Sequence, residues 1–367
     1  ILGINNRSIF NDDEQVIQDK QQIKQENLTI DEKVDKTVES MSQTEKLGQM
    51  VMIGIQGTKV DDDSLYMLNQ YHMGGVILFD RNMESPEQVK QLTSDLQAQS
   101  NEKVPLFIGI DEEGGDVVRM AEKLTPPPSQ KEIGATGDIE QAKTWAIKTA
   151  KSLKDMGINV NFTPVADVGS NDKRSYSIDT NTVIDFVRAA TEGYQQENII
   201  YSLKHFPGIG KGRVDSHVDS SSIDVAKEVL MAEDILPFKT IIDGNEPNDY
   251  FILVSHLKYP ALDEEYPASL SSKIMTDLLR NELGYKGIII TDDMEMGAVA
   301  NHNDFRSIGV KAVKAGADIV LVCHEYKHQQ EVYLGLLDAV NSGEISQERI
   351  DESVKRIIKV KLLHLYQ

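Results

Sequence analysis

Short apolar runs alternate with longer segments of helical spacing from about residue 41 to the end of the chain. The runs are apolar at consecutive positions and span residues 48–55, 74–79, 104–111, 158–164, 198–206, 250–256, 286–293 and 317–323. Such continuous runs are typical of parallel strands that are covered on both faces. The segments between them, such as residues 85–100, have the spacing of amphipathic crossover helices. Eight strand–helix units predict an α/β fold, a (β/α)8 TIM-type barrel, with a doubly wound open sheet as the alternative.

Residues 1–40 have a different pattern. They are rich in Gln, Asn, Asp, Glu and Lys, with isolated apolar residues, as in a solvated tether or a loosely docked helix. We interpret residues 1–40 as a polar N-terminal linker and residues 41–367 as a single barrel domain. The chain starts at Ile1 rather than Met. A polar tether behind a removed leader favours an extracytoplasmic protein, held by a lipid anchor, over a cytoplasmic one.

Composition narrows the range of partners. The chain has 59 acidic and 38 basic residues, a formal net charge of −21, and such a field repels nucleic acid and anionic lipids. The single cysteine excludes an internal disulfide and a thiolate zinc cluster. No apolar run approaches the roughly 18 residues of a membrane span. We therefore expect no nucleic-acid partner and no transmembrane segment.

Polar residues follow the strand runs at the end where a barrel carries its active site. They are Asp111, Asp167, Arg174, Lys204, His205, His256, Asp292 and Asp293. Polar groups that converge on one rim are costly to desolvate, which favours a role in binding a ligand over a place in the core. Ordinary strand-to-loop polarity is the alternative.

The segment 204–217, KHFPGIGKGRVDSH, carries the richest chemistry. Asp215 and His217 are two residues apart, close enough for a carboxylate to hydrogen-bond the imidazole. Such a contact raises the pKa of the imidazole toward neutrality, as a group that acts first as an acid and then as a base requires. A surface loop with an incidental histidine is the alternative.

Adjacent aspartates, Asp292 and Asp293, leave the seventh run. Neighbouring side chains on a strand point to opposite faces, so one of the two should face the rim and the other the wall. From the residues alone, a carboxylate here fits a nucleophile, a metal ligand or a helix cap equally well.

The segment from His324 to His328 reads H-E-x-x-H, the pattern of a zinc metallopeptidase. Zinc binding requires both histidines on one face of an established helix. His324 directly follows the eighth run, and no third ligand is obvious, although His364 is available. The metallopeptidase alternative, with Glu325 as its base, is therefore disfavoured.

Three motifs together resemble glycoside hydrolase family 3, in its single-domain β-N-acetylglucosaminidase branch. They are KHFPG followed by DSH, D-E-E-G-G-x-V-x-R over residues 111–119, and T-D-D-M-E-M-G over residues 291–297. The resemblance covers residues 41–367 and implies a glycoside hydrolase of the β-N-acetylhexosaminidase type. It implies a retaining mechanism in which Asp292 forms a covalent glycosyl-enzyme and His217, supported by Asp215, is the acid/base. The residues expected to hold the N-acetylglucosamine unit are Asp111, Arg119, Arg174, Lys204 and His205.

Retaining glycosidases usually pair two carboxylates about 5 Å apart. Many two-domain members of the family take their acid from a second domain, which this chain is too short to carry, so the Asp215/His217 loop must supply it. Two departures from the family pattern stand out. Ile209-Gly-Lys211 replaces a usual H-G-D, and Asp116 stands where the family usually has arginine.

The sequence thus predicts a monomeric exo-acting enzyme that removes terminal β-linked N-acetylglucosamine from peptidoglycan fragments. Its expected partner is the carbohydrate, with no metal or organic cofactor. The alternatives are the zinc metallopeptidase of His324 and His328 and a catalytically silent sugar-binding barrel.

Overall fold

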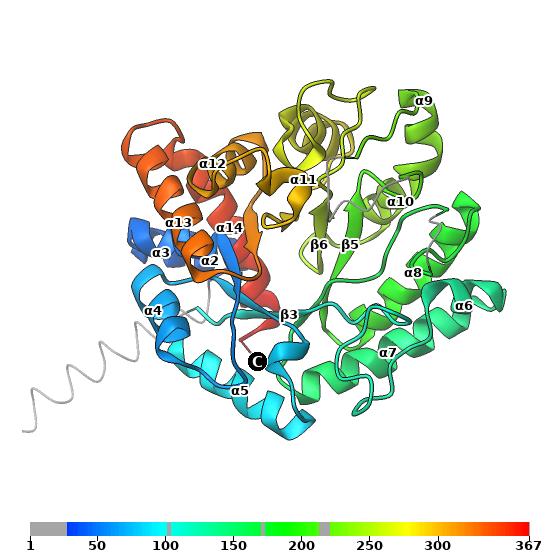
Figure 1. Cartoon of the computed structure of the whole chain (residues 1–367), viewed down its shortest axis with the longest axis horizontal. Helices are drawn as coiled ribbons and strands as arrows, with labels where there is room; N and C mark the ends of the chain where they lie inside the picture. The colour runs from blue at the N-terminus through cyan, green and yellow to red at the C-terminus, as the bar shows by residue number, and fades with distance from the viewer. Residues whose placement is uncertain (1–27, 101–103, 170–172, 213–220, 367) are drawn as a thin grey trace, which may run out of the picture.

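Eight short parallel strands pair in chain order and close on themselves, β8 against β1, in the computed structural model (Figure 1). The structure describes residues 28–100, 104–169, 173–212 and 221–366. The strands are β1 (Val51–Gly54), β2 (Gly75–Leu78), β3 (Phe107–Ile110), β4 (Val160–Asn161), β5 (Ile200–Phe206), β6 (Tyr250–Val254), β7 (Ile288–Asp293) and β8 (Ile319–Val322). The predicted (β/α)8 barrel is confirmed, and the open-sheet alternative is wrong.

Helices surround the strands on all sides in Figure 1. The α-helices are α2 (Ile30–Ser40), α3 (Gln43–Gln49), α4 (Asp62–Tyr71), α5 (Pro86–Gln99), α6 (Gln130–Ala135), α7 (Ile139–Asp155), α8 (Thr180–Gln196), α9 (Lys227–Val229), α10 (Leu236–Gly244), α11 (Gly297–Ala300), α12 (Phe305–Ala315), α13 (Tyr326–Asn341) and α14 (Gln347–His364). The 3₁₀ turns η1 (Asp80–Asn82) and η3 (Ala268–Leu270) and the π-helical segments η2 (Leu230–Asp234) and η4 (Lys273–Glu282) complete the set. Side-chain caps start many of these helices; Ser85, for example, accepts a hydrogen bond from the Gln88 amide at the start of α5.

The inside of the barrel is filled by side chains. Phe107 meets Phe251 edge to face, with ring centroids 5.2 Å apart. A Cβ at Gly109 would lie only 2.7 Å from the side chains of both Met52 and Phe162, so the interior has no room for one. Because the interior is packed, a ligand site has to lie above it, at the C-terminal ends of the strands.

Two irregularities in strand pairing fall at that end. The register of β5 against β6 shifts between Lys204 and Phe206, and that of β7 against β8 shifts between Ile290 and Asp293. Such shifts re-aim side chains locally. They coincide with the strand ends that carry two predicted site residues, Lys204 and Asp292.

Helix α2 packs against α14 at the N-terminal side of the described chain. Val34 and Val38 are buried in this contact, and Asp35 forms an ion pair of 2.7 Å with Lys355. Of the two alternatives weighed for residues 1–40, the docked helix therefore describes residues 30–40. The domain division at residue 40 stays a prediction.

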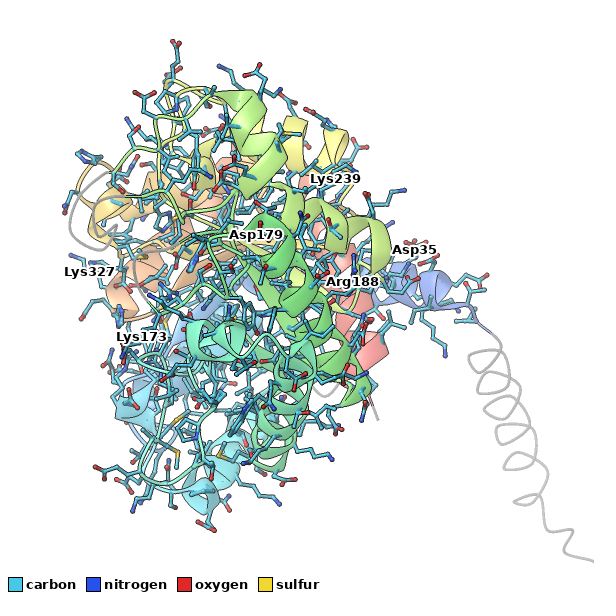
Figure 2. The ribbon with its side chains drawn as sticks, turned by 90° about the vertical axis from the view of Figure 1, so that its right-hand side faces the viewer. Asp35, Lys173, Asp179, Arg188, Lys239 and Lys327 are labelled. Atoms are coloured by element: carbon cyan, nitrogen blue, oxygen red, sulfur yellow. The ribbon has the colours of Figure 1, made fainter. Side chains whose placement is uncertain are left out.

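The outer helices carry charged side chains at the surface. Figure 2 shows Arg188 on α8 and Lys239 on α10 among them. Within the described ranges, no helix combines the length and the apolar character needed to cross a membrane.

A buried carboxylate ties β8 to the helices around it. Asp318 is fully buried, and its oxygens accept hydrogen bonds from Arg280 (2.8 Å), Arg356 (3.0 Å) and the Ser353 hydroxyl (2.6 Å). Arg349 lies 3.9 Å away. Burial alone would raise the pKa of Asp318, but the three arginines outweigh it and hold the pKa below its ordinary value.

Asp318→Asn should lower the free energy of unfolding by about 3–5 kcal/mol at neutral pH, because it leaves buried guanidinium groups without a counter-charge. The depressed pKa means that this stabilisation is present above the unfolded-state pKa of about 3.9 and is lost as pH falls through the folded-state pKa. Denaturant unfolding of both proteins across pH should show the difference shrinking in acid.

The matched control is Asp338→Asn. Asp338 pairs with Arg306 at the surface, where the two side chains are 63% and 51% exposed. Its loss should cost less than about 1 kcal/mol. Equal costs for the two variants would contradict the role given to the buried network.

Candidate active site

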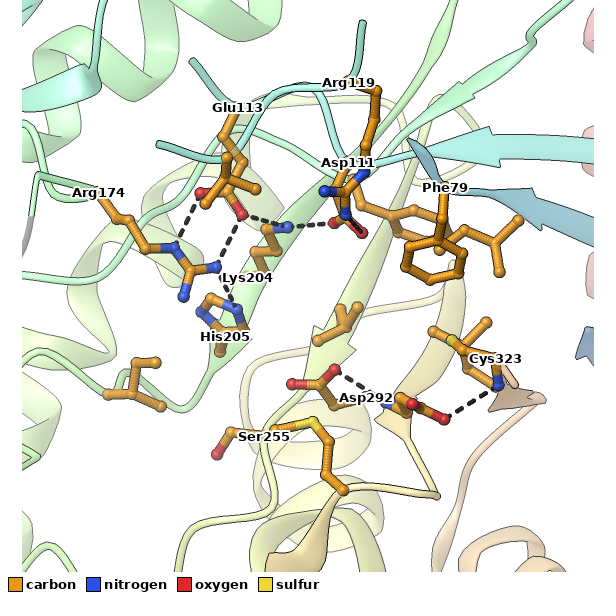
Figure 3. A pocket seen from close by; sticks show the side chains of 18 of the residues that line it. Phe79, Asp111, Glu113, Arg119, Arg174, Lys204, His205, Ser255, Asp292 and Cys323 are labelled. Carbon is orange, nitrogen blue, oxygen red and sulfur yellow. Dashed lines mark hydrogen bonds and ion pairs between the residues drawn. The ribbon is translucent and has the colours of Figure 1, made fainter. Parts of the chain in front are cut away.

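A cavity of about 320 Å³ opens at the C-terminal ends of the strands (Figure 3). Charged and polar side chains from β5 and β7 and from the loops after β3 and β4 line it, together with apolar groups such as Phe79 and Met296. The pocket thus combines an apolar wall with convergent polar groups, as ligand sites do.

Lys204 is the centre of a buried charge network in this pocket. Its ammonium lies 2.7 Å from Asp111 Oδ1 and 2.6 Å from Glu113 Oε1. Arg174 donates to both oxygens of Glu113, at 2.7 and 2.9 Å. Figure 3 shows these contacts side by side. Burial would raise the pKa of Glu113, but the charges of Lys204 and Arg174 outweigh it and hold that pKa well below its ordinary value.

The same balance acts on Lys204. Burial lowers the pKa of its ammonium, but Asp111 and Glu113 overcompensate, so the net shift is upward. Lys204 and Glu113 are therefore both ionised at neutral pH. They present fixed donors and acceptors to the pocket.

His205 is buried, and both of its ring nitrogens are engaged. Nδ1 lies 2.8 Å from Asp167 Oδ2, and Nε2 lies 3.1 Å from Arg174 Nη2. A guanidinium can only donate, so Nε2 accepts and Nδ1 carries the proton that is donated to Asp167. Asp167 also accepts the backbone N–H of His205 (3.1 Å). These contacts determine both the tautomer and the orientation of the ring.

Asp292 lies at the end of β7 and lines the pocket. Its Oδ1 accepts the backbone N–H of Asp293 at 2.8 Å. The side chain of Asp293 turns toward β8, where Oδ1 accepts the N–H of Cys323 at 3.1 Å. Asp292 is therefore the more accessible of the two carboxylates, and Asp293 is the one anchored in the wall.

Arg119 completes the pocket beside Phe79. Its guanidinium lies 5.2 Å from the centre of the Phe79 ring and 3.8 Å from Asp111 Oδ2. Glu112, 2% exposed, accepts the backbone N–H of Arg119 at 2.7 Å. Burial raises the pKa of Glu112 to about 7, against the lowering effect of that hydrogen bond and of the Arg119 charge.

The five residues predicted to hold the sugar, Asp111, Arg119, Arg174, Lys204 and His205, all line this one pocket together with Asp292. Asp215 and His217 lie outside the described residues, so the structure places neither of them. The assigned roles of all eight residues stay predictions.

Glu113 and Phe79 are among the pocket residues that the sequence did not single out. Glu113 is one of three consecutive acidic residues, and nothing in the sequence separates the buried one from its neighbours. Phe79 ends an apolar run, and this pattern predicts a strand but gives no indication of a binding site.

The departures from the family pattern lie in different places. Ile209 lines the pocket, and Asp116 stands at its rim, 3.5 Å from Lys173. Lys211 is engaged elsewhere, since its ammonium pairs with the fully buried Asp234 at 2.6 Å. Lys211 therefore anchors its loop to the π-helical segment η2 instead of contributing a charge to the pocket.

The H-E-x-x-H pattern does not form the helical pair that zinc requires. His324 precedes α13, and only His328 lies in its first turn. The two rings contact different carboxylates, His324 that of Asp293 (3.3 Å) and His328 that of Glu295 (2.6 Å). The metallopeptidase alternative loses its geometric basis.

Asp293, Glu295 and His324 do bring ligand atoms within 4.8 Å of one another. However, Arg81 Nη1 lies 3.0 Å from His324 Nδ1, and an arginine can only donate. In the neutral ring Nε2 then carries the proton and has no lone pair for a cation. Asp293 raises the pKa of His324, whereas Arg81 opposes that rise.

A closed barrel with a charged pocket at the C-terminal ends of its strands defines an enzyme-type (β/α)8 domain. Residues 42–360 match the family described as Glycosyl hydrolase family 3 N terminal domain. The chain belongs to this family, which confirms the resemblance seen in the sequence.

Known relatives agree with this assignment. "Beta-hexosaminidase A" of Pseudoalteromonas piscicida is 35% identical over 80% of this chain, which spans only 54% of that protein. "Beta-hexosaminidase" of Nitrosomonas eutropha is 31% identical over 83% of this chain and 90% of its own length. The solved glycoside hydrolase family 3 β-N-acetylglucosaminidase from Paenibacillus sp. str. FPU-7 superposes with a TM-score of 0.85 at 37% identity, over 88% of this chain and 62% of that one.

Glu112→Gln should make the protein more stable at pH values above 7. The folded-state pKa of about 7 exceeds the unfolded-state value, so the contribution of Glu112 is fully present below about pH 4.3 and is lost as pH rises through the folded pKa. Glutamine keeps an acceptor for the Arg119 N–H without the charge.

The increase in the free energy of unfolding of Glu112→Gln should reach at most about 3–4 kcal/mol above pH 7 and vanish near pH 4. Thermal unfolding at both pH values measures it. Glu132→Gln, on the exposed start of α6, is the control and should show no such gain at high pH. A Glu112→Gln protein less stable than the wild type at pH 8 would refute the assignment.

Proposed function

We propose that this chain is an exo-acting β-N-acetylglucosaminidase that works by a retaining mechanism. The observation that carries the proposal is the position of Asp292, an accessible carboxylate held by one backbone N–H in the same pocket as the Lys204 network. The names of the relatives, beta-hexosaminidases and a β-N-acetylglucosaminidase, support the same chemistry.

The pocket suits a single neutral sugar unit. Its volume of about 320 Å³ lies at the small end of ligand pockets, which favours one ring at a time and hence attack at a chain end. Hydroxyl groups both donate and accept hydrogen bonds, so they can use the carboxylate of Asp111 and the ammonium of Lys204 together. Arg119 and Arg174 add further donors on either side.

In the proposed first step, a carboxylate oxygen of Asp292 attacks the anomeric carbon as the bond to the leaving oxygen breaks. The hydrogen bond from Asp293 occupies Oδ1. Oδ2 has no hydrogen-bond partner among the described residues, so it is the oxygen free to attack. The leaving oxygen takes a proton from His217, supported by Asp215. Water then hydrolyses the glycosyl ester after giving its proton to the same histidine.

We further propose that the natural substrates are peptidoglycan fragments. The family resemblance supports this source. The part of such a substrate beyond the bound sugar would leave the pocket past the rim, where Asp116 pairs with Lys173. The intact Asp292 site argues against a catalytically silent sugar-binding barrel.

Asp292→Ala should lower kcat on an aryl N-acetyl-β-glucosaminide by roughly 10⁴-fold, because no nucleophile remains. Asp116→Asn, a carboxylate change at the rim of the same pocket, is the matched control and should stay within a few-fold of the wild type. A panel of aryl N-acetylglucosaminide, glucoside and xyloside, each with and without EDTA, tests the sugar and the alternatives. Inhibition by EDTA, or binding without any hydrolysis, would contradict the proposal.

His217→Ala should distinguish leaving groups. Poor leaving groups need protonation, so their kcat/KM should fall by about 10²–10⁴-fold, whereas activated aryl groups should lose far less. Initial rates on a series of aryl glycosides of graded leaving-group pKa measure this. An equal loss across the series would remove His217 from the role of acid.

A further inference from the structure

The ring of His324 stands in the pocket wall beside the proposed nucleophile. It follows β8, lines the cavity and remains 47% exposed. Its centroid lies 5.4 Å from that of Phe79, whose ring also contacts the guanidinium of Arg119. The proposed mechanism gives this histidine no role, and its place in the H-E-x-x-H pattern does not lead to a zinc site.

Arg81 contacts the Nδ1 side of the His324 ring. Its Nη1 lies 3.0 Å from His324 Nδ1, while Nε and Nη2 donate to the carbonyls of Ile55 (2.8 Å) and Cys323 (2.5 Å). Space for this guanidinium depends on Gly54, because a Cβ there would lie 2.8 Å from Nη2. Since Arg81 only donates, Nδ1 accepts and Nε2 carries the proton.

That nitrogen lies near the carboxylate of Asp293. Nε2 lies 3.3 Å from Asp293 Oδ2, while Oδ1 of the same carboxylate accepts the N–H groups of Cys323 and Glu295, both at 3.1 Å. The backbone carbonyl of Asp293 lies 2.7 Å from His256 Nε2. Asp293 is thus held on several sides, and its own N–H holds Asp292 Oδ1 at 2.8 Å.

We propose that His324 is a positioning residue for the nucleophile: held by Arg81, it fixes Asp293, whose backbone N–H in turn orients the carboxylate of Asp292. This inference rests on the proposed function of Asp292. His324 acts on the attacking group and on neither the leaving group nor the sugar hydroxyls. Its removal should therefore affect kcat equally for good and poor leaving groups.

The test compares His324→Ala, His324→Gln and His328→Ala on an activated and a poor aryl N-acetyl-β-glucosaminide. His324→Ala should lower kcat by about 10-fold or more on both substrates, because a small misplacement of a reacting group is costly. KM and the inhibition constant of N-acetylglucosamine should change by less than about 3-fold, since the sugar contacts remain. His324→Gln should restore most of kcat, because its amide can accept from Arg81 and donate to Asp293.

His328→Ala is the matched control, since its ring pairs with Glu295 and does not reach Asp293. It should keep kcat near the wild-type value. A wild-type kcat for His324→Ala, a loss confined to KM, an unequal loss between substrates, no rescue by glutamine, or an equal loss in His328→Ala would each overturn the inference.

Crystal structures of the wild type and of His324→Ala separate this inference from the proposed function. If the wild type hydrolyses none of the glycosides, the proposed function fails. The inference is then decided by the position of the Asp292 carboxylate: displacement in the variant supports it, and an unchanged position overturns it.

Discussion

The ammonium of Lys204 is held between two carboxylates at the mouth of the barrel, and the arrangement of the pocket depends on this contact. A buried cation is tolerated only with matched counter-charges, so Asp111 and Glu113 have to stay where they are. The pairing joins β5 to the end of β3, and Arg174 extends it to the loop after β4. One charge network thus holds loops that are far apart in the sequence.

The two ends of the barrel use similar chemistry for different purposes. Around Asp318, buried charges are surrounded by helix and strand, and their pairing contributes only to stability. Around Lys204 the same kind of pairing borders a cavity, so the charges remain within reach of a ligand. A closed barrel makes both arrangements possible. The loops at the C-terminal ends of its strands can build a binding site, while the N-terminal ends contribute to stability.

Much of the fold and of the candidate site could be predicted, because the sequence patterns involved are local or repeated along the chain. Continuous apolar runs identified all eight strands, and strand ends identified Asp111, Lys204, His205 and Asp292 as neighbours. What could not be predicted depends on three-dimensional packing. Glu113 and Glu112 are neighbours of the same residue type, and only the fold shows that Glu113 pairs with Lys204 and Arg174. Lys211 found a partner in Asp234, which lies on a segment that carries no motif.

Other features could not be predicted from the pattern of apolar and polar residues alone. Residues 30–40 have a polar composition, yet two buried valines and an ion pair between Asp35 and Lys355 dock that helix on α14. Two adjacent aspartates leave the seventh run, and only the hydrogen bond from Cys323 shows which of them is anchored in the wall. Alternation along a strand predicts that the two side chains face opposite ways, but it does not say which of them faces the pocket.

The contact between Arg174 and His205 has a consequence for proton transfer in the pocket. Nδ1 donates its proton in a hydrogen bond to Asp167, and Nε2 accepts from Arg174, which can only donate. This imidazole therefore has neither a free N–H to offer a leaving group nor a lone pair open to water. Although it is a histidine in the pocket, it behaves as a fixed dipole. The charged wall built around Lys204 can therefore bind and polarise a sugar, but the proton that turnover requires has to arrive on a group from outside that wall.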